Sequence, residues 1–464
     1  MLSKKKFVLF LSLIIGVCLL VGCGQSGDAQ QVQQEKNNTQ NGVSNNNKEQ
    51  GQSEETASVE EDTFTDEPIT LTLYNRGAGL NTDQDLDDLF ISPVQKQYPN
   101  ISIEYLKGIS LDEMVVSGEL PDLIVTSNYY LRELIDYGLT TDMNEFVKAR
   151  NIDFSKFEQE SLKVMDQFSD NGELHGVPYS MNYGVLLYNQ DIFDRFGVDY
   201  PTDGMYWDEV IELAKQVTRN HEDEQYIGLD IGGVQVISRH RSLMTVDPET
   251  KQPLVDTDAL HSVFELYKSA YEIPGIVQDN GKYLYGMNFF MQDQRLAMFP
   301  YWVAATQSRV PTMKETGINW DMVSFPQSRE NPGYGREVDF HLAIVPPKRG
   351  EQELQAIYRV LETIITEEAQ VEMNKGSRLT IFADPEMRNA YSSAANTFDG
   401  KNLEGIYSVQ PILTPVATKY DGAIYGVLND AAKSMILDGV DINTAIREAQ
   451  ERAVQVVQEI DGNN

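Results

Sequence analysis

Apolar residues between positions 69 and 137 recur at alternating strand and helix spacings, and this pattern constrains the fold of the 464-residue chain more than any other feature. Strand-like alternation or compact apolar runs occupy residues 69–74, 101–105 and 123–125. Helical spacing occupies residues 83–97, 111–117 and 129–137. Strands that alternate with helices through short joints predict a parallel sheet with right-handed connections, and therefore an α/β fold.

Further predicted strands and helices follow after residue 180. Together with the first group, they make a chain that is too long for a single hydrophobic core. An apolar run at 185–189 is typical of a strand, and helical spacing recurs at 207–217, 354–365 and 441–460. The part of the chain with this patterning is about 400 residues long, and single cores stop growing at roughly 250–300 residues. We therefore expect two domains. No repeat of fixed period occurs.

The N-terminus has the features of an export signal. Three lysines at positions 4–6 precede an apolar run from Phe7 to Leu20, which is too short to span a bilayer as a helix. Leu20-Val21-Gly22-Cys23 then resembles the bacterial lipobox, in which small residues precede the cut and the thiol accepts a diacylglycerol. We expect residues 1–22 to be removed as a signal peptide and Cys23 to carry the lipid. An ordinary secretory signal with a chance cysteine is the alternative.

Residues 23–67 have the composition of a flexible tether. They are rich in Gln, Asn, Ser and Glu, and their first aromatic residue is Phe64. Such a segment buries too little apolar surface to offset its ordering entropy, so we expect it to be disordered. Together with the lipid, it predicts a protein that is anchored to the membrane only through its N-terminus. The tether's composition further indicates the outer face of the cytoplasmic membrane of a Gram-positive cell.

Charge and residue usage exclude several classes of partner and site. A formal net charge of −34 argues against nucleic acid and anionic lipid, which bind clustered Lys and Arg. The cysteines are Cys18 and Cys23, so the mature chain has no disulfide, thiolate zinc site or cysteine nucleophile. The five histidines lack ligand spacing, and Asp83, Asp85 and Asp87 are better explained as a helix start than as a calcium loop. We expect no metal and no cofactor.

Six segments, in their order and spacing, resemble a known family. They are residues 118–122, 134–143, 172–179, 187–193, 296–302 and 438–446. From about Pro68 to its C-terminus, the chain resembles the extracellular solute-binding lipoproteins of ABC importers, in the branch that mostly carries sugars and oligosaccharides. One departure is Pro300, where many relatives carry glycine.

The resemblance implies a periplasmic-binding-protein-like fold of type II, with two α/β lobes joined by crossing strands. We expect lobe one at 68–178 plus 326–372 and lobe two at 179–325 plus 373–464, with hinges near 177–178 and 325–326. A monomer of this kind captures a carbohydrate in the cleft between its lobes, closes on it and delivers it to permease subunits. An oligosaccharide is the expected cargo.

Candidate ligand-binding residues are those that suit sugars, namely aromatic rings for ring faces and planar polar groups for paired hydroxyls. They lie in the segments that the resemblance assigns to the cleft and in turns after predicted strands: Trp302, Tyr301, Tyr179, Asn182, Tyr183, Arg76, Asn128, Tyr129, Arg336 and Asp339. Each aromatic residue has core packing as its alternative. If both arginines face the cleft, an acidic sugar becomes attractive, because guanidinium groups pair with carboxylates.

Two other functions stay open at this point. One is a surface lipoprotein that senses a ligand, including a non-sugar solute, without importing it. The other is a carbohydrate-active enzyme, because paired carboxylates for glycoside cleavage leave no readable sequence spacing. Turnover separates the classes, since a binding protein returns its ligand intact.

Overall fold

The computed structural model describes residues 64–80 and 82–462. Residues 62–464 form one compact unit with its own core. The expected signal peptide (1–22), the lipid-bearing Cys23 and the tether up to residue 63 lie outside the described residues, so these remain predictions. Within residues 64–80 and 82–462, no helix combines the length and the apolar character that crossing a bilayer requires.

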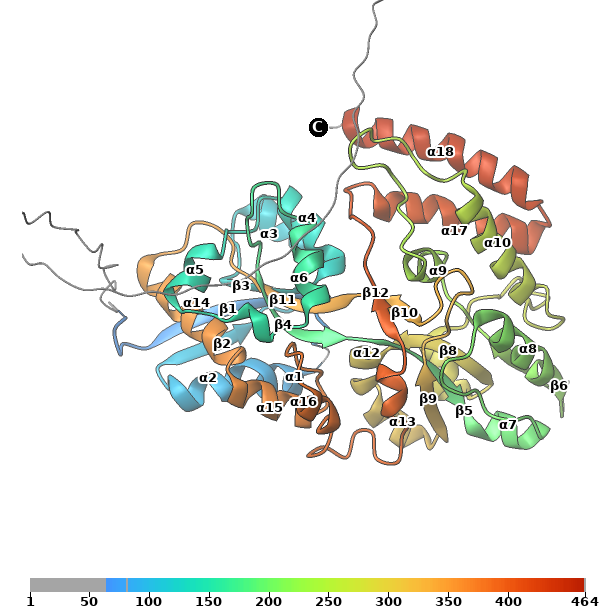
Figure 1. The fold of residues 1–464 in the computed structure, drawn as a ribbon, viewed down its shortest axis with the longest axis horizontal. Helices are drawn as coiled ribbons and strands as arrows, with labels where there is room; N and C mark the ends of the chain where they lie inside the picture. Colours follow the sequence, from blue (N-terminus) through green and yellow to red (C-terminus); the bar gives the residue numbers. More distant parts are fainter. Residues whose placement is uncertain (1–63, 81, 463–464) are drawn as a thin grey trace, which may run out of the picture. The chain divides into compact units, whose positions relative to one another are not determined.

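The first sheet has the order β2-β1-β3-β11-β4 (Figure 1). Its strands are β1 (Ile69–Arg76), β2 (Ile101–Tyr105), β3 (Leu123–Ser127), β4 (Val177–Asn182) and β11 (Asp339–Ile344). Strand β1 pairs in parallel with β2 and β3, which confirms the predicted parallel unit. Strand β11, which arrives from far along the chain, is antiparallel to both β3 and β4. Strands β3, β4 and β11 are buried along their whole length, as expected for strands covered on both faces.

Helices cover both faces of this sheet (Figure 1). The elements are α1 (Asp83–Leu86), the π-helical turn η1 (Asp87–Ile91), α2 (Ser92–Gln97), α3 (Leu111–Ser117), η2 (Asn128–Tyr130), α4 (Leu131–Asp136), α5 (Asn144–Ala149), η3 (Phe154–Lys156), α6 (Gln159–Asp166), α14 (Glu351–Ile364), α15 (Glu367–Lys375) and α16 (Pro385–Asn389). The predicted helix at 83–97 forms, with a π-helical turn inside it. Thr82 caps its start in a capping box with Asp85, so the acidic residues there do mark a helix start.

The second sheet has the order β6-β7-β8-β5-β9. Its strands are β5 (Gly184–Asn189), β6 (Arg219–His221), β7 (Glu224–Leu229), β8 (Leu296–Trp302) and β9 (Trp320–Ser324). Its helices are α7 (Gln190–Phe196), α8 (Trp207–Val217), α9 (Gln235–His240), α10 (Asp258–Tyr271), α11 (Gly286–Asn288), η4 (Phe289–Asp293), α12 (Val303–Gln307) and α13 (Val310–Thr316). Strand β8 continues through Pro300 to Trp302, opposite β5. Trp207 starts α8 with its ring against Phe325, 5.4 Å between centroids.

The C-terminal part adds a helical pair and a short ribbon. Helices α17 (Asp421–Asp438) and α18 (Ile442–Gly462) pack against each other and against α10. Strand β10 (Tyr334–Glu337) pairs with β12 (Gln410–Ile412), which follows the short helix η5 (Glu404–Tyr407). The ribbon therefore connects the segment that precedes β11 with the segment that precedes α17 and α18.

The backbone crosses from the first sheet to the second at Tyr183, and from the β10–β12 ribbon into the first sheet at Val338. Strand β4 ends at Asn182 and β5 begins at Gly184, while β10 ends at Glu337 and β11 begins at Asp339. These crossings do not coincide with the hinge positions expected from sequence, which remain a prediction. Residues 177 and 178 pair with β11 inside the first sheet, and residues 325 and 326 follow β9 before the ribbon. The exact lobe boundaries remain a prediction, although Thr380 forms a bridge with Ser180 of the first sheet.

Two glycines provide a matched test of this packing. A β-carbon on Gly228 of β7 would lie 2.3 Å from the backbone oxygen of Ala214 in α8, whereas one on Gly426 in α17 would meet nothing within 4 Å. We expect Gly228→Ala to lower the free energy of unfolding by about 1–3 kcal/mol, since the strand and helix must separate. Gly426→Ala should raise it by about 0.5–1 kcal/mol, because alanine favours the helix interior. Urea unfolding measures both, and equal effects would contradict the described packing.

Candidate functional site

Polar and aromatic side chains meet where the chain crosses between the sheets. We call this group the crossing site and define it by its members: Ser127, Tyr129, Asn182, Arg239, Trp302, Arg336, Glu337 and Asp339. They come from the ends of β3, β4, β8 and β10, the start of β11, the turn η2 and helix α9. Because β11 lies between β3 and β4, residues distant in sequence become neighbours here.

The carboxylate of Asp339 joins the crossing strands. It accepts a hydrogen bond from the Ser127 hydroxyl at 2.5 Å and one from the Asn182 amide at 2.8 Å. The Asn182 Oδ1 atom in turn accepts a bond from the backbone N–H of Ala304 in α12, at 3.1 Å. A single buried carboxylate therefore connects the ends of β3 and β4 to the start of β11, and through Asn182 to a helix of the second sheet.

Burial also changes the acidity of this group. Removal from water raises the pKa of Asp339 to about 6, although the bonds from Ser127 and Asn182 act in the opposite direction. The carboxyl group therefore titrates in mildly acidic solution rather than near pH 4.

Glu337 lies between two arginines. Its oxygens accept bonds from Arg239 Nε at 3.0 Å and from Arg336 Nε at 3.3 Å. Burial acts to raise the pKa of Glu337, but the nearby charges of Arg336 and Arg239 outweigh it and leave the pKa below its usual value. Glu337 is therefore ionised and paired, as a buried carboxylate must be to avoid a large desolvation cost.

Each of these arginines also lies over an aromatic ring. The guanidinium carbon of Arg336 is 3.9 Å from the centroid of the Trp302 ring, and that of Arg239 is 4.8 Å from the Tyr129 ring. Tyr129 is 40% exposed and Trp302 is half-buried, so both rings retain accessible surface. The site thus combines flat apolar surfaces with fixed hydrogen-bonding groups, which is what a polar ring-shaped ligand requires.

Asn128 positions the second crossing. Its amide donates to the carbonyl of Val338 at 3.3 Å, and its Oδ1 accepts from the backbone N–H of Phe340 at 3.0 Å. The side chain is buried with both groups engaged by backbone. We therefore assign it to holding β11 against β3 and not to direct ligand contact.

Besides Asn128, four further candidates from the sequence lie outside the crossing site. Tyr179 is 1% exposed and packs on Phe90 in the core of the first sheet, 5.4 Å between centroids, so we exclude it from the site. Tyr183 is buried and packs edge-on against Tyr407, 5.5 Å away. Tyr301 lies against Phe299 at 5.4 Å. These contacts are those of core packing, the alternative that the sequence left open.

Arg76, the last of the four, pairs with Glu133. The Nε and Nη2 atoms of Arg76 donate to its two carboxylate oxygens at 3.0 and 3.2 Å, and the guanidinium lies 4.1 Å from the Tyr130 ring. Arg336 is likewise paired, with Glu337. Both guanidinium groups already have a carboxylate partner, which weakens the argument for an acidic sugar.

Sequence reasoning missed Arg239 and Glu337. Arg239 lies in α9 within the run Ser238-Arg239-His240-Arg241, and nothing in that run shows that one arginine is buried. Glu337 could have been proposed from the sequence. It lies two residues before Asp339, and residues at this spacing on a strand point to the same face.

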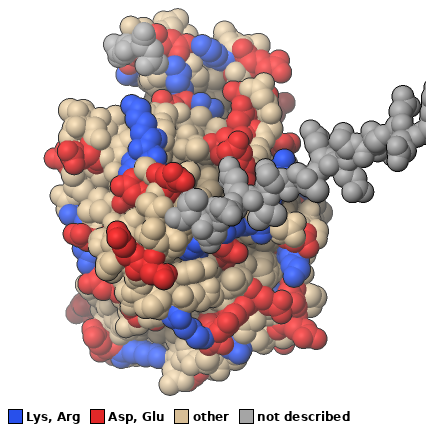
Figure 2. Space-filling model, turned by 90° about the vertical axis from the view of Figure 1, so that its left-hand side faces the viewer, with Lys and Arg blue, Asp and Glu red and all other residues tan. Residues whose placement is uncertain are grey.

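Charged groups outside the site are mixed in sign. Acidic side chains cover much of the face in Figure 2, and Lys and Arg lie between them without forming a broad basic patch. Several cations pair with acids, as in Lys96–Glu368 at 2.6 Å. Among the described residues, no group of three or more His, Cys, Asp or Glu side chains is arranged to hold a metal ion.

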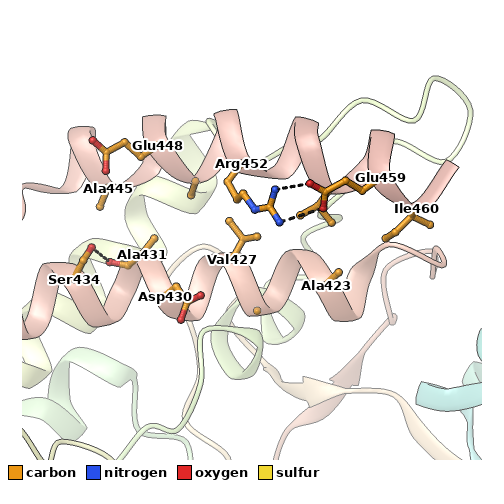
Figure 3. Close-up of a pocket in the computed structure, with 13 residues that line it drawn as sticks. Ala423, Val427, Asp430, Ala431, Ser434, Ala445, Glu448, Arg452, Glu459 and Ile460 are labelled. Carbon is orange, nitrogen blue, oxygen red and sulfur yellow. Dashed lines mark hydrogen bonds and ion pairs between the residues drawn. The ribbon is translucent and has the colours of Figure 1, made fainter. Parts of the chain in front are cut away.

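The most open pocket near the C-terminus is separate from the crossing site. It lies between α17 and α18, has a volume of about 670 Å³ and is lined largely by small and charged residues (Figure 3). Arg452 and Glu459 pair at 2.9 Å along one of its walls. Among the described residues, none that line it has a buried polar side-chain atom without a partner.

Comparison with known proteins identifies the fold. Residues 81–237 match the family model of bacterial extracellular solute-binding proteins. An ABC substrate-binding protein of Listeria monocytogenes in complex with cycloalternan is 15% identical, with a TM-score of 0.68 over 84% of this chain and 100% of that one. A solute-binding protein of Thermotoga lettingae bound to α-D-tagatose is 14% identical, with a TM-score of 0.66 over 84% and 99%. A Mycobacterium tuberculosis protein in complex with glycerophosphocholine is 13% identical, with a TM-score of 0.63 over 84% and 99%.

These findings confirm the resemblance and the fold class inferred from sequence. The chain has the α/β fold of periplasmic-binding-protein-like solute-binding proteins, and the matched family is one of binding proteins. Because the structural neighbours are distant in sequence, they identify the fold and leave the ligand of this chain to be argued from its own residues.

The raised pKa of Asp339 predicts a specific pH dependence. Its pKa is about 6 in the folded chain and 3.8 in the unfolded one, so the native state binds more protons in between. The stability that this group contributes is therefore full below about pH 4 and is lost as the pH rises through about 6. We expect the unfolding free energy of the wild type, minus that of Asp339→Asn, to fall over this range and to level above it. Urea titrations at several pH values measure this difference, and parallel profiles would contradict the assignment.

Proposed function

We propose that this chain is a lipid-anchored extracellular solute-binding protein that captures a neutral carbohydrate and delivers it to the permease of an ABC importer. The observation that carries the proposal is the pairing of Trp302 with Arg336, 3.9 Å apart, at the end of β8. An aromatic ring fixed by a guanidinium group offers one flat face for a sugar ring, beside donors for its hydroxyls. Tyr129 with Arg239 repeats the arrangement on the side of the first sheet.

The charge balance of the crossing site supports a neutral ligand. Arg239 and Arg336 share the carboxylate of Glu337, and Asp339 is engaged by Ser127 and Asn182. An anionic ligand would have to compete with Glu337 for its arginines. Hydroxyl groups donate and accept in turn, so a polyhydroxylated ligand can use these groups without breaking the ion pairs.

The same contacts support binding over catalysis. Glu337 and Asp339 are the carboxylates of the crossing site, and both oxygens of each already accept a hydrogen bond. Neither is free to protonate a glycosidic oxygen or attack a sugar, as a glycosidase requires. A carbohydrate-active enzyme is therefore the weaker alternative, and recovery of intact ligand distinguishes the two.

A non-sugar solute is the second candidate for the cargo. The Mycobacterium tuberculosis neighbour is in complex with glycerophosphocholine, so this fold accommodates a phosphodiester. Ligand import and ligand sensing both begin with the same binding step, so the screen below identifies the ligand class for either function. A thermal-shift screen of residues 62–464 against neutral sugars, acidic sugars, glycerophosphodiesters and peptides separates the ligand classes. Ligand at 100 times its Kd adds about 2.7 kcal/mol to the free energy of unfolding.

The role of Trp302 is testable with the strongest neutral saccharide from that screen. We expect Trp302→Ala to weaken binding by about tenfold to a hundredfold, since burial of an aromatic side chain contributes about 1.5–3 kcal/mol. Calorimetric titration measures the change. Tyr334→Ala, an aromatic residue with 44% exposure outside the crossing site, is the matched control and should bind normally. Unchanged binding in Trp302→Ala, or a response only to glycerophosphodiesters or peptides, would contradict the carbohydrate proposal.

Membrane anchoring depends on Cys23 in this proposal. Cys23→Ala removes the thiol that would accept the diacylglycerol, so we expect the protein to leave the membrane fraction of expressing cells. Fractionation with immunoblotting, together with labelling by a palmitate analogue, measures the change. Cys18→Ala, within the apolar run of the signal, is the matched control and should remain at the membrane. Equal labelling of both variants would exclude Cys23 as the lipid site. We further propose that the protein acts as a monomer on the outer face of a Gram-positive cytoplasmic membrane.

A further inference from the structure

A glycine, Gly184, lies against the side chain of Arg336. It is the first residue of β5, where the chain enters the second sheet, and in the pairing of β5 with β8 it is directly opposite Trp302. A β-carbon on Gly184 would lie 2.6 Å from the Cβ atom of Arg336 and 2.8 Å from its Cδ atom. The side chain of Arg336 therefore occupies the space that any other residue at position 184 would need.

The requirement for glycine at this position is one of space and not of backbone conformation. Gly184 is not one of the glycines with a positive φ, so an alanine could adopt its backbone conformation without strain. Carbon atoms in contact are about 3.5–4.0 Å apart, so a β-carbon at 2.6 Å from Arg336 would force the two strands to separate by about 1 Å.

The strand that would move is β10, which carries Arg336. Strand β5 is held on both sides by β8 and β9, whereas β10 pairs with β12 in a two-stranded ribbon. The guanidinium carbon of Arg336 lies 3.9 Å from the centroid of the Trp302 ring and 5.8 Å from that of Phe325. A shift of β10 away from β5 would therefore withdraw the cation from both rings.

The contact with Arg336 holds the Trp302 ring in place. The side chain of Arg336 is 11% exposed, and it covers one face of a ring that is itself only half-buried. Loss of this contact would give the ring new freedom to rotate, although binding groups must be held within about 0.5 Å of their productive geometry.

We propose that Gly184 is a positioning residue, which admits Arg336 against Trp302 and thereby fixes the ring that the proposed function assigns to the ligand. The effect of Gly184 on binding rests on the proposed function. Its effect on the position of the ring does not, so the two are tested separately.

The position of the ring can be measured without a ligand. The chain has three tryptophans, and labelling residues 62–464 with fluorotryptophan gives each of them a fluorine NMR resonance. Trp302→Phe identifies the resonance of Trp302. We expect Gly184→Ala to shift this resonance and to leave that of Trp320, in β9, in place. Gly228→Ala is the matched control, because its β-carbon would clash with α8 instead, and it should leave the Trp302 resonance unshifted.

The effect on binding should depend on Arg336. With the strongest neutral saccharide from the thermal-shift screen, Gly184→Ala should bind about tenfold more weakly than the wild type, and Gly228→Ala should bind normally. Arg336→Gly removes both atoms nearest to the new β-carbon, and the remaining neighbour, a ring atom of Phe325 at 3.1 Å, needs to give by only a few tenths of an ångström. In the Arg336→Gly background, Gly184→Ala should therefore cause no further loss of affinity.

The outcomes separate this inference from the proposed function. An unshifted Trp302 resonance in Gly184→Ala, or a loss of affinity that persists in the Arg336→Gly background, would make Gly184 an ordinary packing residue and leave the carbohydrate proposal standing. Equal losses of affinity in Gly184→Ala and Gly228→Ala would have the same meaning. If the wild type binds no saccharide, the proposed function fails, and the fluorine resonances alone decide the positioning role.

Discussion

The hydrogen bonds of the Asp339 carboxylate are the interaction on which the rest of this structure depends. The chain passes from the first sheet to the second at Tyr183 and from the β10–β12 ribbon into the first sheet at Val338, and Asn182 and Asp339 lie next to these crossings. One buried carboxylate bonds to Ser127 and Asn182 and so fixes the ends of β3 and β4 against the start of β11. Because Asn182 also accepts from Ala304, the same interaction reaches the helix that follows Trp302. The position of the Trp302 ring is therefore set by the crossing itself.

The buried charged side chains next to the crossing are paired with one another. Arg239 and Glu337 are both almost fully removed from water, and losing either partner would leave an uncompensated buried charge. Arg336 pairs with the other side of Glu337, and the nearby carboxylate of Asp339, when ionised, supplies the second negative charge that balances the two arginines. The result is a site that presents rings and hydrogen-bonding groups without a net demand for counter-charge. This balance fits a cargo that is itself uncharged, in a protein whose overall charge of −34 would repel an anion at long range.

Local pattern was enough to predict the three parallel strands of the first sheet and several helices. The alternation at Ile69–Tyr74 and the helical spacing at residues 111–117 are properties of neighbouring residues, and the structure has both elements where they were expected. The antiparallel strand β11 was beyond such reasoning, since its partners lie more than 150 residues earlier. The backbone crossings differ from the expected hinge positions for a related reason: Val177 and Pro178 pair with β11, which local pattern does not reveal. Among the site residues, Trp302, Arg336 and Asp339 could be proposed from residue type and resemblance. The burial of Tyr179 and the Arg239–Glu337 pair depend on tertiary contacts and could not.

A crystal structure of residues 62–464 with a neutral oligosaccharide bound would test the central claim most directly. The account predicts one sugar ring on the face of Trp302, with the Arg239–Glu337 and Arg336–Glu337 pairs intact and hydroxyls bonded within the crossing site. A ligand bound in the groove between α17 and α18, or one that binds by displacing Glu337 from its arginines, would contradict it.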